Sequence, residues 1–342
     1  MSKDEDFHPH RAPRIGKNTA DSSPAKTARS VRSATTEGLR SVYAKEVRMN
    51  QDVANNYHAR MRRVLDHIDA HLDEDLSVEV LAAVAAFSRH HFQRQFSGLY
   101  GIGVAAYVQL ARMKRASYRL AFRERDGVLG IALDSGYEGP EAFSRAFRRL
   151  FEQSPSSFRR APRWEPWHAA QSPLVQARRQ TMTFTDDDVR IVDFPDTPVA
   201  VMRHEGDPAL LGDTIRRFIA WRRAAGLPPR VSATFNVFHD DPDDTPAEQY
   251  RLDLCAATAR VASNPDGVTS GVIPGGPCAV LRQIGSSDDL RAASRFLYGE
   301  WLPRSGREPR DAPFFAQRVS FFPDVPEHEA VTDLFLPLSP RT

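Results

Sequence analysis

A short pattern of aromatic and basic residues occurs twice in the first half of the chain, and this repeat most limits how the chain folds. The pattern Phe-x-Arg-x-Phe stands at 92–96 and again, 51 positions later, at 143–147. Each copy follows a short apolar segment and a tight turn, at 85–88 and at 135–137. Phenylalanines four positions apart lie on one face of a helix. The repeat therefore predicts two helix-turn-helix units.

The residues around the repeat predict the helices of these units. Met61, Leu65, Ile68 and Leu72 recur at helical spacing, which indicates a first helix beginning near residue 56. Ser77 and its counterpart before the first pattern, Ser88, are typical N-cap residues. Further helices are expected over residues 89–100, about 104–125, 128–134 and 140–151.

The exposed faces of the second helix in each unit are the candidates for contact with double-stranded DNA. A helix fits the major groove, and Gln and Arg match the edges of adenine and guanine. The connecting helix of about 22 residues would span roughly 33 Å, close to one turn of DNA, so one chain could reach two successive grooves. A helical bundle with a merely basic surface is the alternative. The candidate residues are Arg89, His90, Gln93, Arg94, Pro140, Glu141, Ser144 and Arg145, with Arg148 and Arg149 expected on phosphates.

Charge is distributed unevenly along the chain. Residues 1–165 hold 27 Lys and Arg against 20 Asp and Glu, whereas residues 166–342 hold 19 against 24. The excess is largest over 88–163, with 14 basic and 6 acidic residues. A basic segment joined to an acidic one indicates a module that binds a polyanion and a second module with another task.

Composition divides the chain into four segments. Residues 1–50 are rich in Ser, Thr, Arg, Lys and Pro without apolar periodicity, and we expect a disordered basic tail. The DNA-binding domain is expected over 51–163. Residues 164–182, with prolines and several Gln, are expected to be a linker, and 183–342 a second domain.

The second domain contains a duplication of its own. Pro198-Val-Ala-Val-Met-Arg203 matches Pro277-Cys-Ala-Val-Leu-Arg282 at an offset of 79. Each half is expected to run strand–strand–helix–strand–strand, with helices over about 210–225 and 287–302. The predicted fold is thus multidomain: an all-α double helix-turn-helix domain followed by a duplicated α+β domain. Paired halves leave a cleft, the usual place for a small ligand.

Other classes of protein find little support in the sequence. No run approaches the roughly 18 apolar residues of a membrane span. The two cysteines, Cys255 and Cys278, lack metal-ligand spacing, and a reduced, cytoplasmic compartment is expected. His67 and His71 have a spacing that can bind zinc, but no third ligand is nearby. We expect no metal, no cofactor, no membrane association and no enzymatic activity.

The helical half resembles the DNA-binding domain of AraC/XylS-family regulators over about 105 residues. Ala86 and Glu152 stand where that family usually has Gly. The resemblance implies that the candidate residues face DNA grooves and that RNA polymerase is a partner. The matching motifs are Leu76-Ser-x-x-x-Leu-Ala82, Ser88-x-x-x-Phe-x-Arg-x-Phe96, Ile131-Ala-x-x-x-Gly-Tyr137, Phe143-Ser-Arg-Ala-Phe-Arg148 and Ser154-Pro-x-x-Phe-Arg-Arg160.

The second domain resembles the GyrI-like effector-binding domain over about 155 residues, through Pro198–Gly206, Ile273–Gly276 and Trp301–Gly306. In relatives a buried Glu pairs with cationic drugs, but here that position holds Ala316, followed by Gln317. A preference for organic cations is therefore not expected, unless Glu205 or Glu300 turns inward. The aromatic residues that either line the cleft or form core are Trp221, Phe235, Tyr298, Trp301 and Phe315.

Together these features predict a sequence-specific transcription regulator whose DNA binding is modulated by a small-molecule effector in the C-terminal domain. The alternative is a DNA-binding regulator whose C-terminal domain binds a protein partner instead. A thermal-shift screen of small molecules separates the two. Neither the effector, the operator nor the sign of regulation is specified by the sequence.

Overall fold

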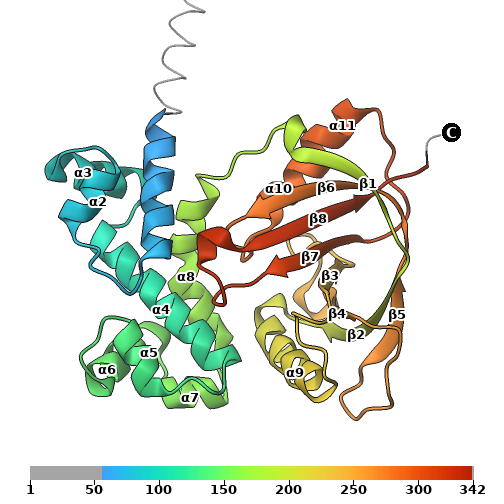
Figure 1. Cartoon of the computed structure of the whole chain (residues 1–342), viewed down its shortest axis with the longest axis horizontal. Coiled ribbons are helices and arrows are strands. Elements are labelled where there is room, and N and C mark those ends of the chain that lie inside the picture. Colours follow the sequence, from blue (N-terminus) through green and yellow to red (C-terminus); the bar gives the residue numbers. More distant parts are fainter. Residues whose placement is uncertain (1–55, 341–342) are drawn as a thin grey trace, which may run out of the picture. The chain divides into compact units, whose positions relative to one another are not determined.

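The computed structural model describes residues 56–340, and residues 57–340 belong to one compact unit. The tail expected over 1–50 lies outside the described residues. The N-terminal part of this unit is helical (Figure 1). In chain order its helices are residues 56–70, α2 (Val78–Val84), α3 (Arg89–Tyr100), α4 (Val104–Phe122), α5 (Val128–Asp134), α6 (Pro140–Phe151), α7 (Pro155–Arg160) and α8 (Trp164–Arg179).

Local signals in the sequence set the ends of these helices. The hydroxyl groups of Ser77 and Ser88 accept hydrogen bonds from backbone N–H groups in the first turns of α2 and α3. Gly101 ends α3 in the left-handed conformation, with φ 69°. Pro140 begins α6, where its missing N–H costs nothing. The predicted bounds of α3, α5 and α6 are therefore found in the structure.

Two residues without the freedom of glycine occupy left-handed backbone conformations. Ala86, in the turn between α2 and α3, has φ 53°, and Glu152, after α6, has φ 55°. These are the two positions at which the related family usually has Gly. A non-glycine residue in this conformation costs roughly 1–2 kcal/mol.

Ala86→Gly is therefore expected to raise the free energy of unfolding by about 1 kcal/mol, since the relieved strain exceeds the entropy that glycine adds to the unfolded chain. Urea denaturation followed by circular dichroism measures the change. Ala83→Gly is the matched control: this exposed residue lies within α2, where glycine should destabilise by about 1 kcal/mol. A loss of stability in both variants would show that the turn is not strained.

The helical part contains two apolar cores joined by α4. The phenylalanines of the first pattern are buried in one core and those of the second pattern in the other. Helix α8 contributes to both, with Leu174 and Ala177 in the first and Trp164 and Trp167 in the second. The expectation of a linker over 164–182 is thus incorrect for most of its length. A DNA-binding fragment ending near residue 165 would lack apolar residues of both cores.

The C-terminal part is one antiparallel sheet of eight strands in the order β1-β6-β8-β7-β3-β4-β2-β5. Exchanging β1–β4 with β5–β8 reverses this order, so the two halves are related by a pseudo-twofold axis between β3 and β7. The predicted duplicated α+β fold is confirmed. The strands are β1 (Val189–Phe194), β2 (Thr197–Glu205), β3 (Thr234–Phe238), β4 (Arg251–Ala257), β5 (Thr269–Ile273), β6 (Gly276–Ile284), β7 (Phe314–Ser320) and β8 (Val331–Pro337).

Helices cover one face of this sheet. The first half places α9 (Leu211–Ala224) there, and the second half places α10 (Arg291–Arg295), the π-helical turn η4 (Phe296–Trp301) and α11 (Leu302–Ser305). An aromatic cluster containing Phe194, Phe235, Phe315 and Phe335 packs separately from these helix-covered cores. None of the described helices is long and apolar enough to cross a membrane.

Candidate DNA-binding surface and ligand cavity

Helix α3 presents a polar face opposite its buried phenylalanines. Phe92 and Phe96 are fully buried, whereas Arg89, His90, Gln93 and Arg94 are exposed. Arg89 also forms a 2.8 Å ion pair with Glu79 on α2. The predicted groove-facing residues of the first unit are therefore accessible and lie together on one helix.

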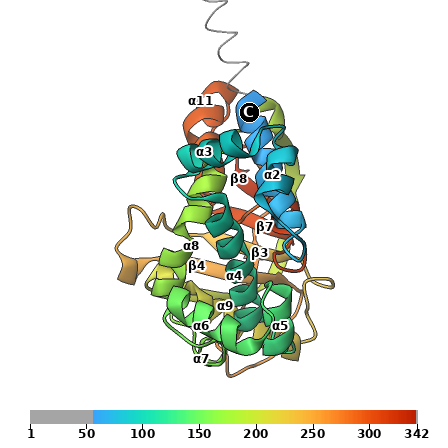
Figure 2. The same cartoon turned by 90° about the vertical axis from the view of Figure 1, so that its left-hand side faces the viewer.

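Helix α6 repeats this arrangement in the second unit. Figure 2 shows α3 and α6 toward the viewer on the same side of the molecule, with α4 between them. Helix α4 has 19 residues, three fewer than predicted, or about 28 Å of helix. On α6, exposed positions are held by Glu141, Arg145, Arg148 and Arg149, while Pro140 and Ser144 are partly buried.

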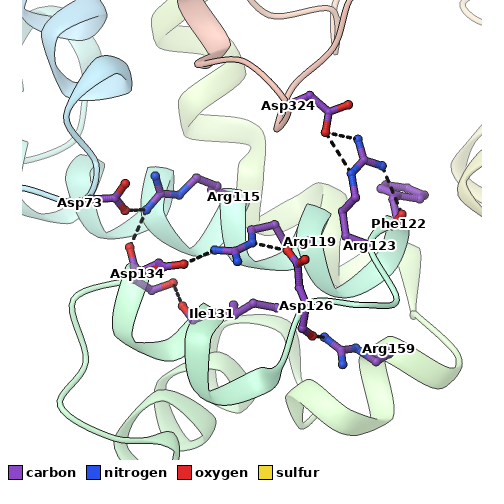
Figure 3. A network of polar contacts seen from close by, with 11 residues as sticks. Asp73, Arg115, Arg119, Phe122, Arg123, Asp126, Ile131, Asp134, Arg159 and Asp324 are labelled. Atoms are coloured by element: carbon purple, nitrogen blue, oxygen red, sulfur yellow. Dashed lines mark hydrogen bonds and ion pairs between the residues drawn. The ribbon is translucent and has the colours of Figure 1, made fainter. Parts of the chain in front are cut away.

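Arginines on α4 join the two units through ion pairs (Figure 3). Arg115 contacts Asp73 from the first unit and also donates to the backbone oxygen of Asp134 at the end of α5. Arg119 pairs with Asp126 at 2.6 Å and with Asp134 at 2.5 Å. A displacement of α4 therefore acts on both helix-turn-helix units.

Helix α4 and its C-cap residue, Arg123, also contact the C-terminal domain. Arg123 pairs with Asp324 at 2.6 Å (Figure 3), and the Tyr118 hydroxyl donates to Asp288 at 2.6 Å. Lys114, only 2% exposed, pairs with Asp288 at 2.5 Å and with Glu327. Burial alone would lower the pKa of Lys114, but these two carboxylates raise it well above its usual value. Lys114 is therefore a buried cation held by two acidic groups from the second domain.

Helix α8 contacts both α4 of the helical part and α9 of the C-terminal part. The Trp164 indole N–H donates to Asp213 of α9 at 2.9 Å, and the Trp167 indole N–H donates to Ser117 of α4 at 2.7 Å. Gly212 of α9 lies against Trp164 so closely that a Cβ there would be 2.4 Å from the ring. The predicted linker thus packs tightly on both α4 and α9.

Between these elements lies a cavity of about 1250 Å³, larger than the roughly 300–1,000 Å³ of a typical ligand pocket. Its walls come from α9, the α10–η4 segment and the central strands β3 and β7. Residues of α4 and α8, among them Tyr118, Arg123 and Trp167, also line it. A ligand in the cavity would therefore touch both the duplicated domain and the helix that joins the DNA-binding units.

The five aromatic residues that were expected to line a ligand cleft lie in different parts of the structure. Tyr298 lines the cavity and is partly exposed. Trp221 and Trp301 are buried beneath α9 and η4 in the cores of the two halves. Phe235 and Phe315 belong to the separate aromatic cluster of the sheet. Four of the five are thus core residues, and the cavity is lined instead by Tyr118, Phe122, Phe238, Phe314 and Phe321, with charged residues among them.

Two arginines of the cavity were not found from the sequence. Arg222 of α9 is buried, and burial lowers its pKa to about 10. Arg318 of β7 has a buried Nε atom without a hydrogen-bond partner among the described residues. Only its position on the same face of β7 as Phe314, four residues earlier, could have signalled that it faces a ligand.

The described geometry defines a class of protein in which two helix-turn-helix units and a second domain with a large cavity all contact one connecting helix. Comparison with known families agrees. Residues 81–161 match a helix-turn-helix domain, and residues 187–339 match the GyrI-like small molecule binding domain. The chain belongs to the AraC-type transcriptional regulators that carry a C-terminal GyrI-like domain, and it is a DNA-binding protein.

Curated relatives are bacterial transcription regulators. The probable transcriptional regulator YgiV of Escherichia coli (strain K12) is 38% identical over 160 residues, which are 46% of this chain and 100% of that protein. The right origin-binding protein of the same strain is 32% identical over 139 residues, which are 41% of this chain and 46% of that protein. The curated relatives support a regulatory function rather than a catalytic one.

Similar solved structures include a crystal structure of the DNA-binding domain of AdpA in complex with a target DNA. It is 31% identical and matches 32% of this chain and 93% of that chain, with a TM-score of 0.27. The C-terminal domain of EcmrR is 17% identical and matches 45% of this chain and 98% of that chain, with a TM-score of 0.38.

Proposed function

We propose that α3 and α6 read an operator in two major grooves and that a small molecule in the cavity modulates this binding. The base-reading candidates are Arg89, His90, Gln93 and Arg94 on α3 and Pro140, Glu141, Ser144 and Arg145 on α6, with Arg148 and Arg149 on phosphates; all except the partly buried Pro140 and Ser144 are exposed. Their exposure, and the presence of both helices on one side of the molecule, support this assignment. RNA polymerase is a proposed partner by family resemblance, and a cytoplasmic location is proposed because the target of the regulator is DNA.

The observation that carries the proposed regulation is the composition of the cavity wall. Tyr118 and Arg123 line the cavity and at the same time bind Asp288 and Asp324 of the second domain. A ligand that changes these contacts changes the position of α4, and α4 is bonded to both helix-turn-helix units. Coupling of this kind requires only that the ligand binds two arrangements of α4 with different affinity.

Tyr118→Phe tests this route without removing an apolar side chain. The variant loses the hydrogen bond to Asp288 but keeps the ring that contacts Phe322. A compound from a thermal-shift panel that stabilises the protein should still bind, but it should change the affinity for operator DNA less than in the unmodified protein. Equal coupling in both proteins would exclude Tyr118 from the route.

Arg149→Ala is expected to weaken binding to all DNA sequences about equally. The side chain is exposed beyond the base-reading face of α6, where it is proposed to contact a phosphate. Each lost phosphate contact should lower the slope of log affinity against log salt by about 0.9. Affinities for an operator and for an unrelated duplex, measured at several salt concentrations, give both quantities. Weakening of the operator complex alone would assign Arg149 to a base instead.

A further inference from the structure

Two arginines from different elements, Arg222 and Arg318, line the cavity near the centre of the sheet. Strands β3 and β7 are antiparallel, and their register places Thr234 directly opposite Arg318. Opposed Cα atoms in such a pair lie about 4.5–5.5 Å apart. The Thr234 hydroxyl accepts a hydrogen bond from the guanidinium of Arg222 on α9. Arg222 is therefore hydrogen-bonded to the residue that lies opposite Arg318, close to the pseudo-twofold axis.

Only neutral groups bind the guanidinium of the first cation, Arg222. The guanidinium of Arg222 donates to the backbone oxygens of Leu227 and Ser232, each at 2.7 Å, and to the Thr234 hydroxyl. No carboxylate lies within ion-pair distance of it among residues 56–340. Its positive charge is thus buried without a counter-ion, an arrangement that is costly unless an anion joins it.

The second cation, Arg318, has a hydrogen-bond donor without a partner and a charge without an ion-pair partner among the described residues. Arg318 donates to the Ser287 hydroxyl at 2.6 Å, and its buried Nε has no hydrogen-bond partner in the described part of the chain. Burial lowers the pKa of Arg318, and the nearby Tyr118 and Asp288 only partly offset this effect. Asp288 itself is held by Lys114 at 2.5 Å and by the Tyr118 hydroxyl at 2.6 Å. It is therefore already neutralised by a different cation.

The carboxylates around the cavity leave these arginines unpaired. Within the described residues, the lining carboxylates are all Asp, and five of the six form ion pairs with basic side chains other than Arg222 and Arg318. The sixth, Asp241, is exposed to solvent. Ala316, between Phe314 and Arg318 on β7, supplies no charge. The paired residues are Asp240, Asp243, Asp288, Asp289 and Asp324.

We propose that the cavity binds an organic carboxylate with an apolar body, and that Arg318 is the residue that recognises its charge. This inference rests on the proposed function, because it names the ligand class of the same cavity. A guanidinium binds a carboxylate through two parallel N–H···O bonds, and the unpartnered Nε offers one of those donors. Phe238, Phe314 and Tyr298 provide an apolar wall for the rest of the molecule. Arg222 lines the same cavity and adds a second positive charge to it.

Three fluorescent probes of one shape test the proposal on the full chain: 4-(1-pyrenyl)butyrate, its neutral primary amide and 4-(1-pyrenyl)butylammonium. The butyrate should bind at least tenfold more tightly than the amide, and the ammonium should bind most weakly. Arg318→Gln should reduce the preference for the butyrate to less than about threefold while leaving affinity for the amide unchanged. Arg318→Lys, which keeps the charge, should retain most of the preference.

The matched control is Arg260→Gln, because Arg260 also belongs to the second domain but is exposed to solvent and does not line the cavity. It should leave the preference intact. Tighter binding of the ammonium or the amide, failure of the butyrate to bind, or a preference that survives Arg318→Gln would overturn the proposal. Affinity for operator DNA is measured alongside: Arg318-dependent binding of the butyrate without any effect on DNA would refute the proposed regulation and leave the ligand class standing.

Discussion

Replacing Lys114 with methionine is expected to lower the free energy of unfolding by about 3–5 kcal/mol. The side chain is almost completely buried between α4 and the second domain, where it is bound to both Asp288 and Glu327. Methionine fills similar space but leaves two negative charges in a poorly solvated place without a cation. The loss should therefore come from the unpaired carboxylates rather than from the missing ammonium group itself.

Two comparisons isolate that cause. Combining Lys114→Met with Asp288→Asn and Glu327→Gln should recover much of the lost stability, because the unpaired charges are then removed. Arg123→Met breaks a more exposed ion pair on the same helix and should cost no more than about 1 kcal/mol. Urea denaturation of all variants measures the effects. Equal losses for Lys114→Met and Arg123→Met would show that the Lys114 cluster is not buried in solution.

Arg94→Ala is expected to weaken binding to operator DNA by about 1–3 kcal/mol and to relax the sequence requirement at one base pair. Arg94 is exposed on α3, and no ion pair within residues 56–340 holds it. A guanidinium in this position can donate two hydrogen bonds to a guanine edge. The operator can be obtained by selection from random duplexes with the full chain.

Binding of Arg94→Ala to single-base variants of that operator measures both effects. Arg260→Ala, an exposed residue of the second domain, is the control and should bind as the unmodified protein does. An unchanged affinity and an unchanged sequence preference for Arg94→Ala would mean that α3 does not read bases.

The helix-turn-helix units were predictable because their signals are local. A phenylalanine pattern fixes which face of each helix is buried, and Ser88, Gly101 and Pro140 fix the ends. The pseudo-twofold sheet was also predictable, since the two halves repeat the same strands at a nearly constant offset. In each case the information lies within a few residues or in a comparison of two similar segments.

Helix α8 was missed because its sequence resembles a linker. Pro166 lies in its first turn, where proline is tolerated, whereas Pro173 lies inside the helix and normally disfavours one. Tertiary contacts outweigh this preference: Trp164, Trp167 and Leu174 bury apolar surface in the two helical cores. The buried residues do recur at helical spacing, but the prolines and glutamines among them hide this pattern in the sequence.

The cavity lining could not be predicted from residue type. Both faces of the sheet carry aromatic residues, so Phe235 and Phe238 look alike in sequence although only Phe238 lines the cavity. The register of β3 with β7 places Arg318 opposite Thr234, the residue to which Arg222 of α9 is hydrogen-bonded. The positions of the two arginines depend on how the two halves of the sheet pair, and the offset of the sequence repeat does not predict this pairing.

The most direct test of the account compares the affinity of the full chain for its selected operator with and without a saturating cavity ligand. The ligand is the compound that most raises the thermal unfolding temperature of the protein. The account predicts a change of at least fivefold, and an equal change in ligand affinity when operator DNA is added, because the coupling is reciprocal. Affinities that agree within twofold in both directions would contradict it.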